Sequence, residues 1–362
     1  MTDFDITRDK LIGELAAWFN IHKRELPWRH TPDPYKIWLS EIILQQTRVD
    51  QGLPYYHAFV ENFPTVHDLA KAPIDRVLRL WQGLGYYSRG RNLHACAKII
   101  VEKYSGCFPA ERQTLLELPG IGDYTAAAIA SFAFGKKEAV VDGNVIRVIS
   151  RLFGITDDTR QSSTISRIKA LASQLLPDKD HPEFNQAMME FGAMQCRPGK
   201  PDCLACPLAD VCVAYKQNRM AVIPFKSKSK AARIRHFNYL VIEYDKRLLL
   251  MKRSQNDIWK YLYEFLLIET LESQNFDQLE LPGYLSNNSD RWVLKEESGT
   301  YLHVLSHQKI MARFYHIHLF QLPKMAESPW KNDDFLSLEK VERLPKPVLI
   351  ARYLDDKIIS SD

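Results

Sequence analysis

Four of the six cysteines lie in one short stretch, where their thiolates can bind a metal together. They are spaced C-x6-C-x2-C-x5-C and are Cys196, Cys203, Cys206 and Cys212. Four soft ligands so close in sequence suit either zinc or an iron–sulfur cluster. Zinc is the commoner structural metal, but its four-cysteine sites usually carry two C-x2-C pairs, and this sequence has only one. The spacing predicts a metal centre, with a slight preference for zinc and neither metal excluded.

A second stretch, LPGIGDYTAAAIASFAFGKKEAVVDGNVIRVISRL, combines a glycine turn with a carboxylate. The turn through Gly120 and Gly122 leads into an Ala-rich helix, and the unpaired N–H groups of a helix start can bind a phosphate. Asp142 stands directly before a second helix. Taken alone, it reads as an N-cap worth about 1 kcal/mol, and a catalytic role needs support from the flanking motifs.

The elements that carry these groups are predicted from the spacing of apolar residues. Residues 1–215 read as nearly all α-helical, and a helix from Tyr35 carries Glu41, Gln45 and Gln46 towards its C-terminal end. The other predicted helices are 7–22, 52–62, 65–70, 73–80, 88–104, 123–134, one that begins at Asp142, 161–175 and 182–194. Cys96 and Cys107 are expected in the helical core or at its edge.

The basic residues in excess are confined to one segment. Residues 1–215 hold 25 Lys and Arg against 25 Asp and Glu, whereas 216–236 hold 7 against 0 and 237–362 hold 16 against 19. Net charge therefore does not mark residues 1–215 as a DNA-binding region, and 216–236 reads as a basic interdomain linker. After it, alternating segments such as HFNYLVIEY and ARFYHIHLF, with a helix near 346–357, predict an α+β domain over 237–362.

No apolar run has membrane-spanning length, and the first residues form an acidic, then amphipathic, segment rather than a signal peptide. We therefore expect a cytoplasmic protein that does not bind membranes, associated with the nucleoid if it is bacterial. In that compartment clustered cysteines are metal ligands rather than disulfides.

These motifs together resemble a known family. LPGIGDYTA resembles a helix–hairpin–helix, VVDGNV the turn and aspartate that follow it, and the four cysteines the iron–sulfur loop of the endonuclease III superfamily. SEIILQQTRV and WQGLGYYSRGRNL narrow the resemblance to adenine DNA glycosylases of the MutY type. That resemblance implies a [4Fe–4S] cluster, against the preference from spacing, and excision of adenine paired with 8-oxoguanine or guanine in double-stranded DNA during base excision repair. We expect a monomer.

The same resemblance implies the architecture. The helix–hairpin–helix catalytic region spans 1–215, with a six-helix barrel at 27–134 and an iron–sulfur subdomain formed by 1–26 and 135–215. A Nudix-like domain that recognises 8-oxoguanine follows the linker and spans 237–362. It lacks the carboxylate-rich Nudix box that binds a divalent metal, so no Nudix hydrolysis is expected.

The resemblance also assigns roles in the reaction. Glu41 matches the general acid that protonates adenine, and apolar neighbours would raise its pKa. Asp142 matches the carboxylate that stabilises the sugar cation, and the helix start is expected to keep it ionised. Tyr124 and Asn144 match residues that support this chemistry by hydrogen bonding. Tyr124 also occupies the position of the lysine nucleophile of bifunctional relatives, which predicts a monofunctional enzyme without efficient lyase activity.

Further positions match residues that contact DNA or a base. Gln46 and Tyr86 match residues inserted into the duplex, with Thr47 and Leu84 beside the opposite base, and Leu118, Gly120 and Gly122 belong to the phosphate-binding hairpin. Ser306 and His307 match a loop that contacts 8-oxoguanine, in which Leu305 replaces an aromatic residue. The remaining matches, at the adenine pocket and in the QQTRV motif, are Arg24, Trp28, Arg29, Arg48, Val49 and Gln186.

Two other functions fit parts of this sequence. One is a related glycosylase with another mismatch preference, such as thymine opposite guanine, which the long C-terminal domain disfavours. The other is a catalytically silent DNA-damage binder, which the presence of both Glu41 and Asp142 disfavours.

Overall fold

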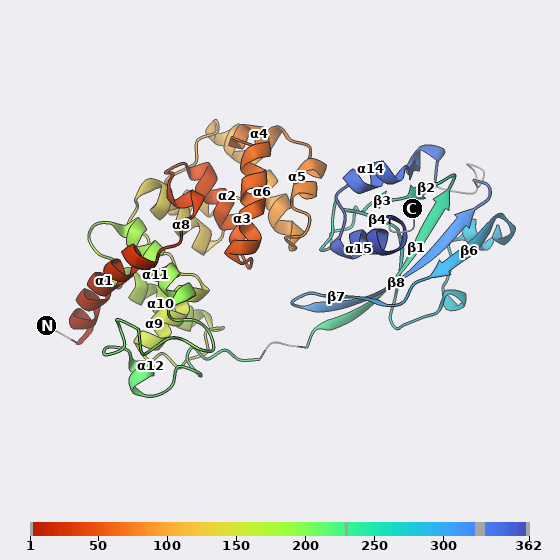
Figure 1. The fold of residues 1–362 in the computed structure, drawn as a ribbon. Coiled ribbons are helices and arrows are strands. Elements are labelled where there is room, and N and C mark those ends of the chain that lie inside the picture. The colour runs from red at the N-terminus through yellow and green to blue at the C-terminus, as the bar shows by residue number, and fades with distance from the viewer. Residues whose placement is uncertain (1–2, 229–230, 323–329, 360–362) are drawn as a thin grey trace. The chain divides into compact units, whose positions relative to one another are not determined.

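The computed structural model describes residues 3–228, 231–322 and 330–359, with the side chains of residues 3–7 left out (Figure 1). The chain divides into two compact units. Unit 1 comprises Met1–Ala70 and Ala95–Lys228, and unit 2 comprises Lys71–His94 and Ser229–Asp362. Residues 71–94, which the sequence analysis assigned to the helical barrel, group with the C-terminal residues in this division. Residues 229 and 230 of the predicted linker lie outside the described residues.

Unit 1 is α-helical throughout its described part. Its helices agree closely with the predicted ones, except that α2 ends at Leu44, so Gln45 and Gln46 lie beyond the helix rather than in its last turn. The elements are α1 (Asp3–His22), the 3-10 helix η1 (Pro27–Arg29), α2 (Pro34–Leu44), α3 (Val49–Asn62), α4 (Val66–Lys71), the second part of α6 (Tyr87–Tyr104), α7 (Arg112–Leu115), α8 (Asp123–Phe134), α9 (Gly143–Leu152), α10 (Ser162–Leu175), α11 (His181–Met194) and α12 (Val213–Lys216).

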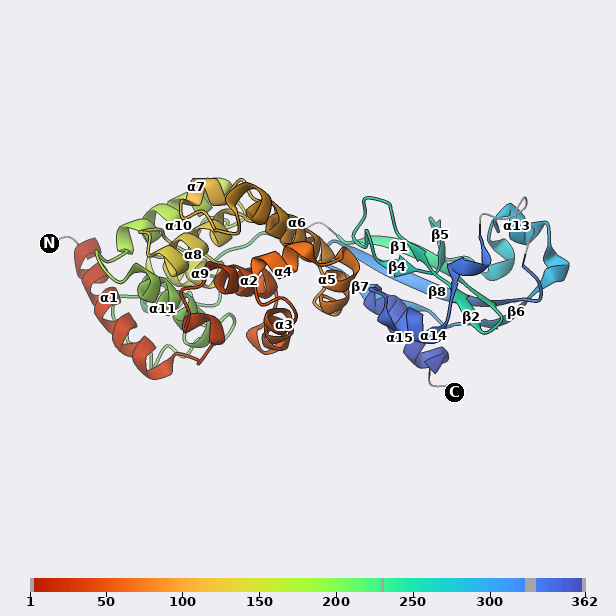
Figure 2. The ribbon, with the colours of Figure 1, turned by 90° about the horizontal axis from the view of Figure 1, so that it is seen from above.

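Helix starts in unit 1 are marked by side chains that satisfy free N–H groups. Asp33 precedes α2 and accepts a hydrogen bond from the Tyr35 N–H, and Asp142 caps α9 in the same way. The α9 residues Val145, Val148 and Ile149 face a core shared with α1, α10 and α11. Figures 1 and 2 both show α9 beside α11.

Unit 2 is built on a mixed sheet with strand order β6-β8-β1-β2-β9, in which β5 also pairs with β1 and β7 with β8. The two long central strands, β1 and β8, run parallel, from Arg233 paired with Gln308 to Glu243 paired with His318. The strands are β1 (Arg233–Tyr244), β2 (Arg247–Leu249), β3 (Met251–Lys252), β4 (Tyr263–Glu264), β5 (Leu266–Thr270), β6 (Trp292–Glu297), β7 (Tyr301–Val304), β8 (Gln308–Leu319) and β9 (Phe335–Leu336).

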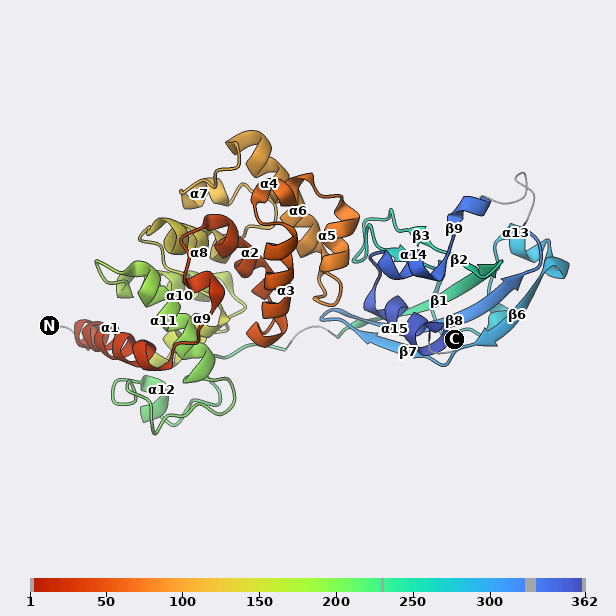
Figure 3. The same cartoon turned by 45° about the horizontal axis from the view of Figure 1, so that its top comes forward.

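Helices cover both faces of this sheet. On one face Phe314 of β8 stacks on Tyr353 of α15 (Val348–Lys357), with ring centroids 4.0 Å apart. The opposite face packs Tyr315 and Ile317 with Leu285 of α13 (Gly283–Ser286). Figures 2 and 3 show α14 (Leu338–Arg343) close to α15. Unit 2 also contains α5 (Ile74–Leu80) and the start of α6.

No helix in the described part of the chain is long and apolar enough to span a membrane.

Close packing of α9 against α11 generates a stability prediction. A Cβ atom added at Gly192 of α11 would lie 2.7 Å from the Asn144 Cβ and 2.9 Å from the Asn144 carbonyl oxygen, so the two helices would have to separate. We expect Gly192→Ala to lower the free energy of unfolding by about 1–3 kcal/mol. Urea denaturation measures the change.

Gly13, in the exposed face of α1, is the matched control because no atom lies within 4 Å of an added Cβ there. Gly13→Ala should stabilise the protein by about 0.4–1 kcal/mol. Equal shifts in the two variants would show that helix propensity, not the α9–α11 contact, controls the outcome.

Candidate functional site

A cavity of about 570 Å³ opens in unit 1 among α2, α8, α9 and α11. This size is typical of a ligand site. Its lining brings together most of the residues that the sequence analysis assigned to the chemistry and to the adenine pocket. They are Arg24, Trp28, Arg29, Glu41, Gln46, Thr47, Val49, Gly122, Tyr124, Asp142 and Asn144.

Glu41 is held on the inner face of α2 with 6% of its surface exposed. Burial, reinforced by the negative charge of Asp142, raises its pKa to about 7, although the Tyr124 hydrogen bond and Arg29 act in the opposite direction. The Tyr124 hydroxyl donates to Glu41 Oε2 at 2.5 Å. A carboxyl group with this pKa carries its proton in a large share of molecules at neutral pH, which suits a general acid.

Asp142 caps α9 with one carboxylate oxygen and binds the Asn144 side chain with the other. Its Oδ1 accepts hydrogen bonds from the backbone N–H groups of Asn144 and Val145, at 2.9 and 2.8 Å, and its Oδ2 accepts from Asn144 Nδ2 at 2.7 Å. Burial nevertheless raises the pKa of Asp142 above its usual value, despite these hydrogen bonds and the nearby Arg147. Desolvation therefore outweighs the cap in the net pKa shift, and the expectation that the helix start keeps Asp142 ionised stays a prediction.

Asn144 is itself fixed by a second set of hydrogen bonds. Arg147 Nη2 donates to Asn144 Oδ1 at 2.9 Å and to the Gly192 carbonyl at 2.6 Å, and Arg147 Nε donates to the Cys196 carbonyl at 2.8 Å. The side chain that orients Asp142 is thus anchored to α11 and to the beginning of the cysteine loop.

Glu190 is a site residue that the sequence analysis missed. Its side chain is 2% exposed and binds Arg24 Nε at 2.7 Å and Arg29 Nη2 at 2.8 Å. Although burial opposes ionisation, these hydrogen bonds and charges lower the pKa of Glu190 to about 2. One buried carboxylate therefore fixes two guanidinium groups in the cavity wall. Its position four residues after Gln186, on the same face of α11, is the signal that could have identified it.

The turn after α2 supplies another part of the wall. Gln46 adopts a positive φ of 55°, which is unusual for a residue with a side chain, and it lines the cavity together with Thr47. Gln45 Nε2 donates to Thr125 Oγ1 at 3.1 Å and ties the turn to α8. Arg48 is the residue before α3 and does not line the cavity.

Gln186 lies apart from the main cavity. It lines a recess of about 40 Å³ together with Glu41, Trp28 and Met189. It also borders an open depression of about 540 Å³ that includes Arg24 and Arg29. Gln186 was predicted at the adenine pocket. In the structure it does not line the main cavity, but it lines neighbouring recesses that share Arg24, Arg29 and Glu41 with that cavity.

The predicted phosphate-binding turn forms as a tight connection between α7 and α8. Gly120 has a φ of 78°, which favours glycine, whereas Gly122 has an ordinary φ of −91° and forms the cap position of α8. Leu118 is buried and its carbonyl accepts from the Ile121 N–H at 3.2 Å. Only Gly122 of these residues lines the cavity.

The four clustered cysteines belong to one loop that packs against the core of unit 1. Burial raises the pKa of the Cys206 thiol to about 12, and the other three cysteine sulfurs add to this effect. Four soft sulfur donors in one loop suit a cationic metal centre, which would stabilise their thiolate forms against this burial. Within the described ranges, no group of three or more His, Cys, Asp or Glu is arranged to hold a metal ion.

Arg151 fastens the cysteine loop to α9. Its guanidinium is buried and donates to the carbonyls of Ile223, Met220 and Arg197, each at 2.9 Å, and its Nη1 lies 3.3 Å from Cys196 Sγ. The two isolated cysteines differ: Cys96 is buried, as expected, but Cys107 is exposed.

The remaining predicted contact residues lie in unit 2, around a separate cavity of about 450 Å³. Leu84 and Tyr86 come from the loop before α6, and Ser306 and His307 from the tight turn between β7 and β8. Tyr86 is 41% exposed, whereas Leu84 is buried. Leu305, which replaces the aromatic residue of the expected pattern, also lines this cavity.

Two family models match this chain, one over much of the helical region and one over the C-terminal sheet. Residues 39–174 match the model of HhH-GPD superfamily base excision DNA repair proteins, and residues 238–356 match the NUDIX domain. A solved thermostable thymine-DNA glycosylase is 32% identical with a TM-score of 0.55, and covers 60% of this chain and 100% of its own. Endonuclease III in a non-covalent complex with DNA is 25% identical with a TM-score of 0.52, and covers 60% of this chain and 98% of its own.

Two further relatives are themselves named adenine DNA glycosylases. The human adenine DNA glycosylase is 43% identical over 214 residues, which cover 57% of this chain and 39% of the relative. The adenine DNA glycosylase of Buchnera aphidicola subsp. Baizongia pistaciae is 33% identical over 296 residues, which cover 81% of this chain and 82% of the relative. With this cavity and this extent of similarity, the chain belongs to the family of adenine DNA glycosylases.

Proposed function

We propose that this protein is a monofunctional DNA glycosylase that flips adenine out of the duplex and removes it when it is paired with 8-oxoguanine or guanine. The observation that carries the proposal is the pair of carboxyl groups in one cavity, a buried Glu41 with a pKa of about 7 and a capped Asp142. Cleavage of the bond between adenine and the sugar needs a proton on the leaving base and a negative charge near the sugar cation.

Each wall of the cavity has a part in this reaction. Glu41, which receives a hydrogen bond from Tyr124, would donate its proton to N7 of the flipped adenine. Asp142, oriented by Asn144, would lie next to the sugar and stabilise its positive charge. Arg24 and Arg29, held by Glu190, would fix the position of the base.

A bifunctional mechanism needs an amine that attacks the sugar. Tyr124 stands where that lysine is expected, and among the residues that the structure describes none that lines the cavity is a lysine. The product is therefore expected to be an intact strand with an abasic site.

Reading of the base opposite adenine is assigned to the cavity of unit 2. The Tyr86 loop and the turn with Ser306 and His307 provide an aromatic ring and hydrogen-bonding groups there. The exposed Ser306 and His307 side chains could distinguish 8-oxoguanine from guanine by hydrogen bonds. Contact with phosphates is assigned to the N–H groups at the start of α8, after Gly120 and Gly122.

We further propose that the four clustered cysteines hold a [4Fe–4S] cluster. The repulsion among their sulfurs and their soft donor chemistry support this choice of ligands. The cluster would hold the loop that Arg147 and Arg151 connect to α9, so its main effect would be on the position of the helix that begins after Asp142.

The role of Asp142 can be tested by an isosteric change. Asp142→Asn keeps the oxygen that caps α9 but removes the charge, so we expect adenine excision to fall by at least about a hundredfold. Duplexes with adenine opposite 8-oxoguanine or guanine, and with thymine opposite guanine, are incubated with the enzyme and analysed with and without alkali. For the wild-type enzyme, we expect strand breaks in the adenine-containing duplexes only after treatment with alkali.

Asp33→Asn is the matched control, because Asp33 also caps a helix with its side chain but lies outside the cavity. It should excise adenine at nearly the normal rate. If the two variants are equally active, Asp142 is a structural cap only. Excision of thymine but not adenine would support the alternative mismatch preference, and breaks without alkali would contradict the monofunctional assignment.

The rate of adenine excision should depend on pH. Because the protonated form of Glu41 is the donor, kcat/KM for adenine excision should decrease as the pH rises through about 7. The Tyr124 hydrogen bond lowers the pKa of Glu41, so Tyr124→Phe should move this decrease to higher pH. Glu41→Gln should abolish the activity. A decrease at the same pH in the Tyr124→Phe variant would show that another group is responsible.

The proposed iron–sulfur cluster can be tested by removing one of its ligands. Cys206→Ser should remove iron and acid-labile sulfide from the purified protein and lower its thermal stability, because the loop loses one ligand. Cys107→Ser changes an exposed cysteine outside the cluster and should keep the full iron content. If the purified wild-type protein contains zinc and no acid-labile sulfide, the four cysteines bind zinc and not an iron–sulfur cluster.

A further inference from the structure

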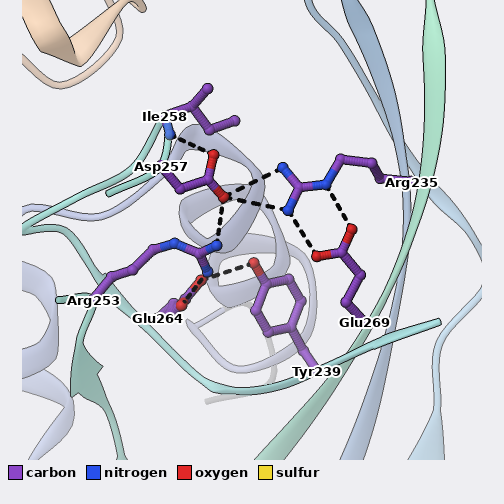
Figure 4. Close-up of polar contacts among 7 residues, drawn as sticks. All are labelled: Arg235, Tyr239, Arg253, Asp257, Ile258, Glu264 and Glu269. Atoms are coloured by element: carbon purple, nitrogen blue, oxygen red, sulfur yellow. Dashed lines mark hydrogen bonds and ion pairs between the residues drawn. The ribbon is translucent and has the colours of Figure 1, made fainter. Parts of the chain in front are cut away.

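Unit 2 contains a group of five charged side chains that the proposed reaction does not use. Figure 4 shows Arg235, Arg253, Asp257, Glu264 and Glu269 joined by hydrogen bonds and ion pairs. The guanidinium-bearing side chain of Arg253 is 4% exposed and that of Arg235 is 11% exposed. Burial of so many charges is costly unless each is paired, so their arrangement calls for a role.

Asp257 is the centre of this group. Its Oδ2 accepts from Arg253 Nη2 at 2.6 Å and from both Nη atoms of Arg235 at 3.3 Å. Its other oxygen, Oδ1, accepts from the backbone N–H of Ile258 at 2.5 Å (Figure 4). The carboxylate thus connects two arginines on the sheet side to the backbone of the next residue.

The other two carboxylates hold the arginines to the sheet. Glu264 of β4 binds Arg253 Nη1 and receives a hydrogen bond from the Tyr239 hydroxyl at 3.1 Å. Glu269 of β5 binds Arg235 through both oxygens, each at 2.7 Å. Because Arg235 lies on the central strand β1, Asp257 is attached directly to the sheet of unit 2.

Asp257 belongs to the loop between β3 and β4, which is closed at its base. The Arg253 N–H donates to the Leu262 carbonyl at 2.9 Å, and the Tyr261 N–H donates to the Arg253 carbonyl at 2.8 Å. Tyr261 has a φ of 70°, an unfavourable value for a residue with a side chain. The loop conformation therefore depends on interactions that hold it in place.

This loop forms one wall of the unit 2 cavity through Ile258 and Trp259. Trp259 is 3% exposed, and its ring contacts His303 of β7, with centroids 5.6 Å apart. On its other side Trp259 packs on Phe237, whose ring is covered by the Arg235 guanidinium at 4.6 Å. Contacts thus run from the Asp257–Arg235 pair to the strand that leads to Ser306 and His307.

The same loop also touches the third wall. Arg91 of α6 donates to the Lys260 carbonyl at 3.2 Å, and α6 follows directly after the loop that carries Tyr86. The Arg253–Leu262 loop, which Asp257 anchors, therefore contacts two other parts of the cavity lining, the β7 strand and the start of α6.

We propose that Asp257, held by Arg235 and Arg253, is a positioning residue that sets the shape of the cavity in unit 2 and so determines discrimination of the base opposite adenine. This inference rests on the proposed function of that cavity. Asp257 itself does not line the cavity; it acts through Ile258 and Trp259.

The test compares 8-oxoguanine:adenine with guanine:adenine duplexes. For each, the single-turnover excision rate and the dissociation constant are measured, and the ratio of rate over dissociation constant for the two duplexes gives the discrimination. Asp257→Asn keeps the shape of the side chain but loses its charge, and it should reduce this ratio roughly tenfold, because a small misplacement of the wall weakens lesion-specific contacts. Ile258→Ala, which trims the wall directly, should reduce the ratio as well.

In the double variant the reduction should be less than the product of the two single effects, because both changes act on one wall. Glu243→Gln is the matched control, since Glu243 is also a paired carboxylate of the unit 2 sheet, bound to Lys295 and His316, but lies outside the group around Asp257 and does not line the cavity. It should leave the ratio unchanged. A purely structural role for Asp257 would lower the melting temperature without changing the ratio.

The proposal is overturned if Asp257→Asn discriminates as the wild type does, or if Glu243→Gln reduces the ratio equally. Should Asp257→Asn fail to fold, Arg235→Lys keeps the positive charge, loses the paired contacts, and must reduce the ratio instead; an unchanged ratio also overturns the proposal. A wild-type enzyme that excises adenine equally from both duplexes contradicts the proposed function of the cavity, which is a different outcome.

Discussion

The capping of α9 by Asp142 is the interaction on which the catalytic site depends. One carboxylate terminates the helix with one oxygen and binds Asn144 with the other, so its direction is set by the helix. The helix in turn is held by Arg147 and Arg151, which reach the loop that contains Cys196. The loop that contains the four cysteines, α9 and the Asp142 carboxylate are therefore connected by one set of hydrogen bonds, although none of the six cysteines, all of which the structure describes, lines the cavity.

Much of this arrangement could be predicted because it is local in sequence. The α8 boundaries, 123 to 134, follow from the Ala-rich run between two glycines, and Asp142 stands directly before an amphipathic segment. Hydrogen bonds within three residues decide such features, and residue types alone reveal them. The role of Glu41 came from family resemblance instead, since neither spacing nor periodicity distinguishes a buried acid from an exposed one. The spacing of the cysteines predicts a metal centre, but the choice of a [4Fe–4S] cluster over zinc also came from the resemblance.

The features that escaped prediction depend on residues far apart in the chain. Glu190 pairs with Arg24 across 166 positions, and no local pattern marks that contact. The net direction of the Asp142 pKa shift depends on how deeply the folded chain buries it, which outweighs the visible cap. α2 ends at Leu44 because Gln45 leaves the helical conformation with a ψ of 114°, and Gln46 follows with a positive φ that no residue pattern indicates.

The buried Glu41 also affects the stability of the folded chain. A carboxyl group whose folded pKa is about 7, against an ordinary value of 4.5, binds its proton more tightly when the chain is folded. The contribution of Glu41 to the free energy of unfolding is therefore largest below pH 4.5. It declines as the pH rises towards about 7, by about 3 kcal/mol in all. The carboxyl group that we propose as the general acid thus weakens the fold at the neutral pH at which it would act, and the remaining core must compensate for that loss.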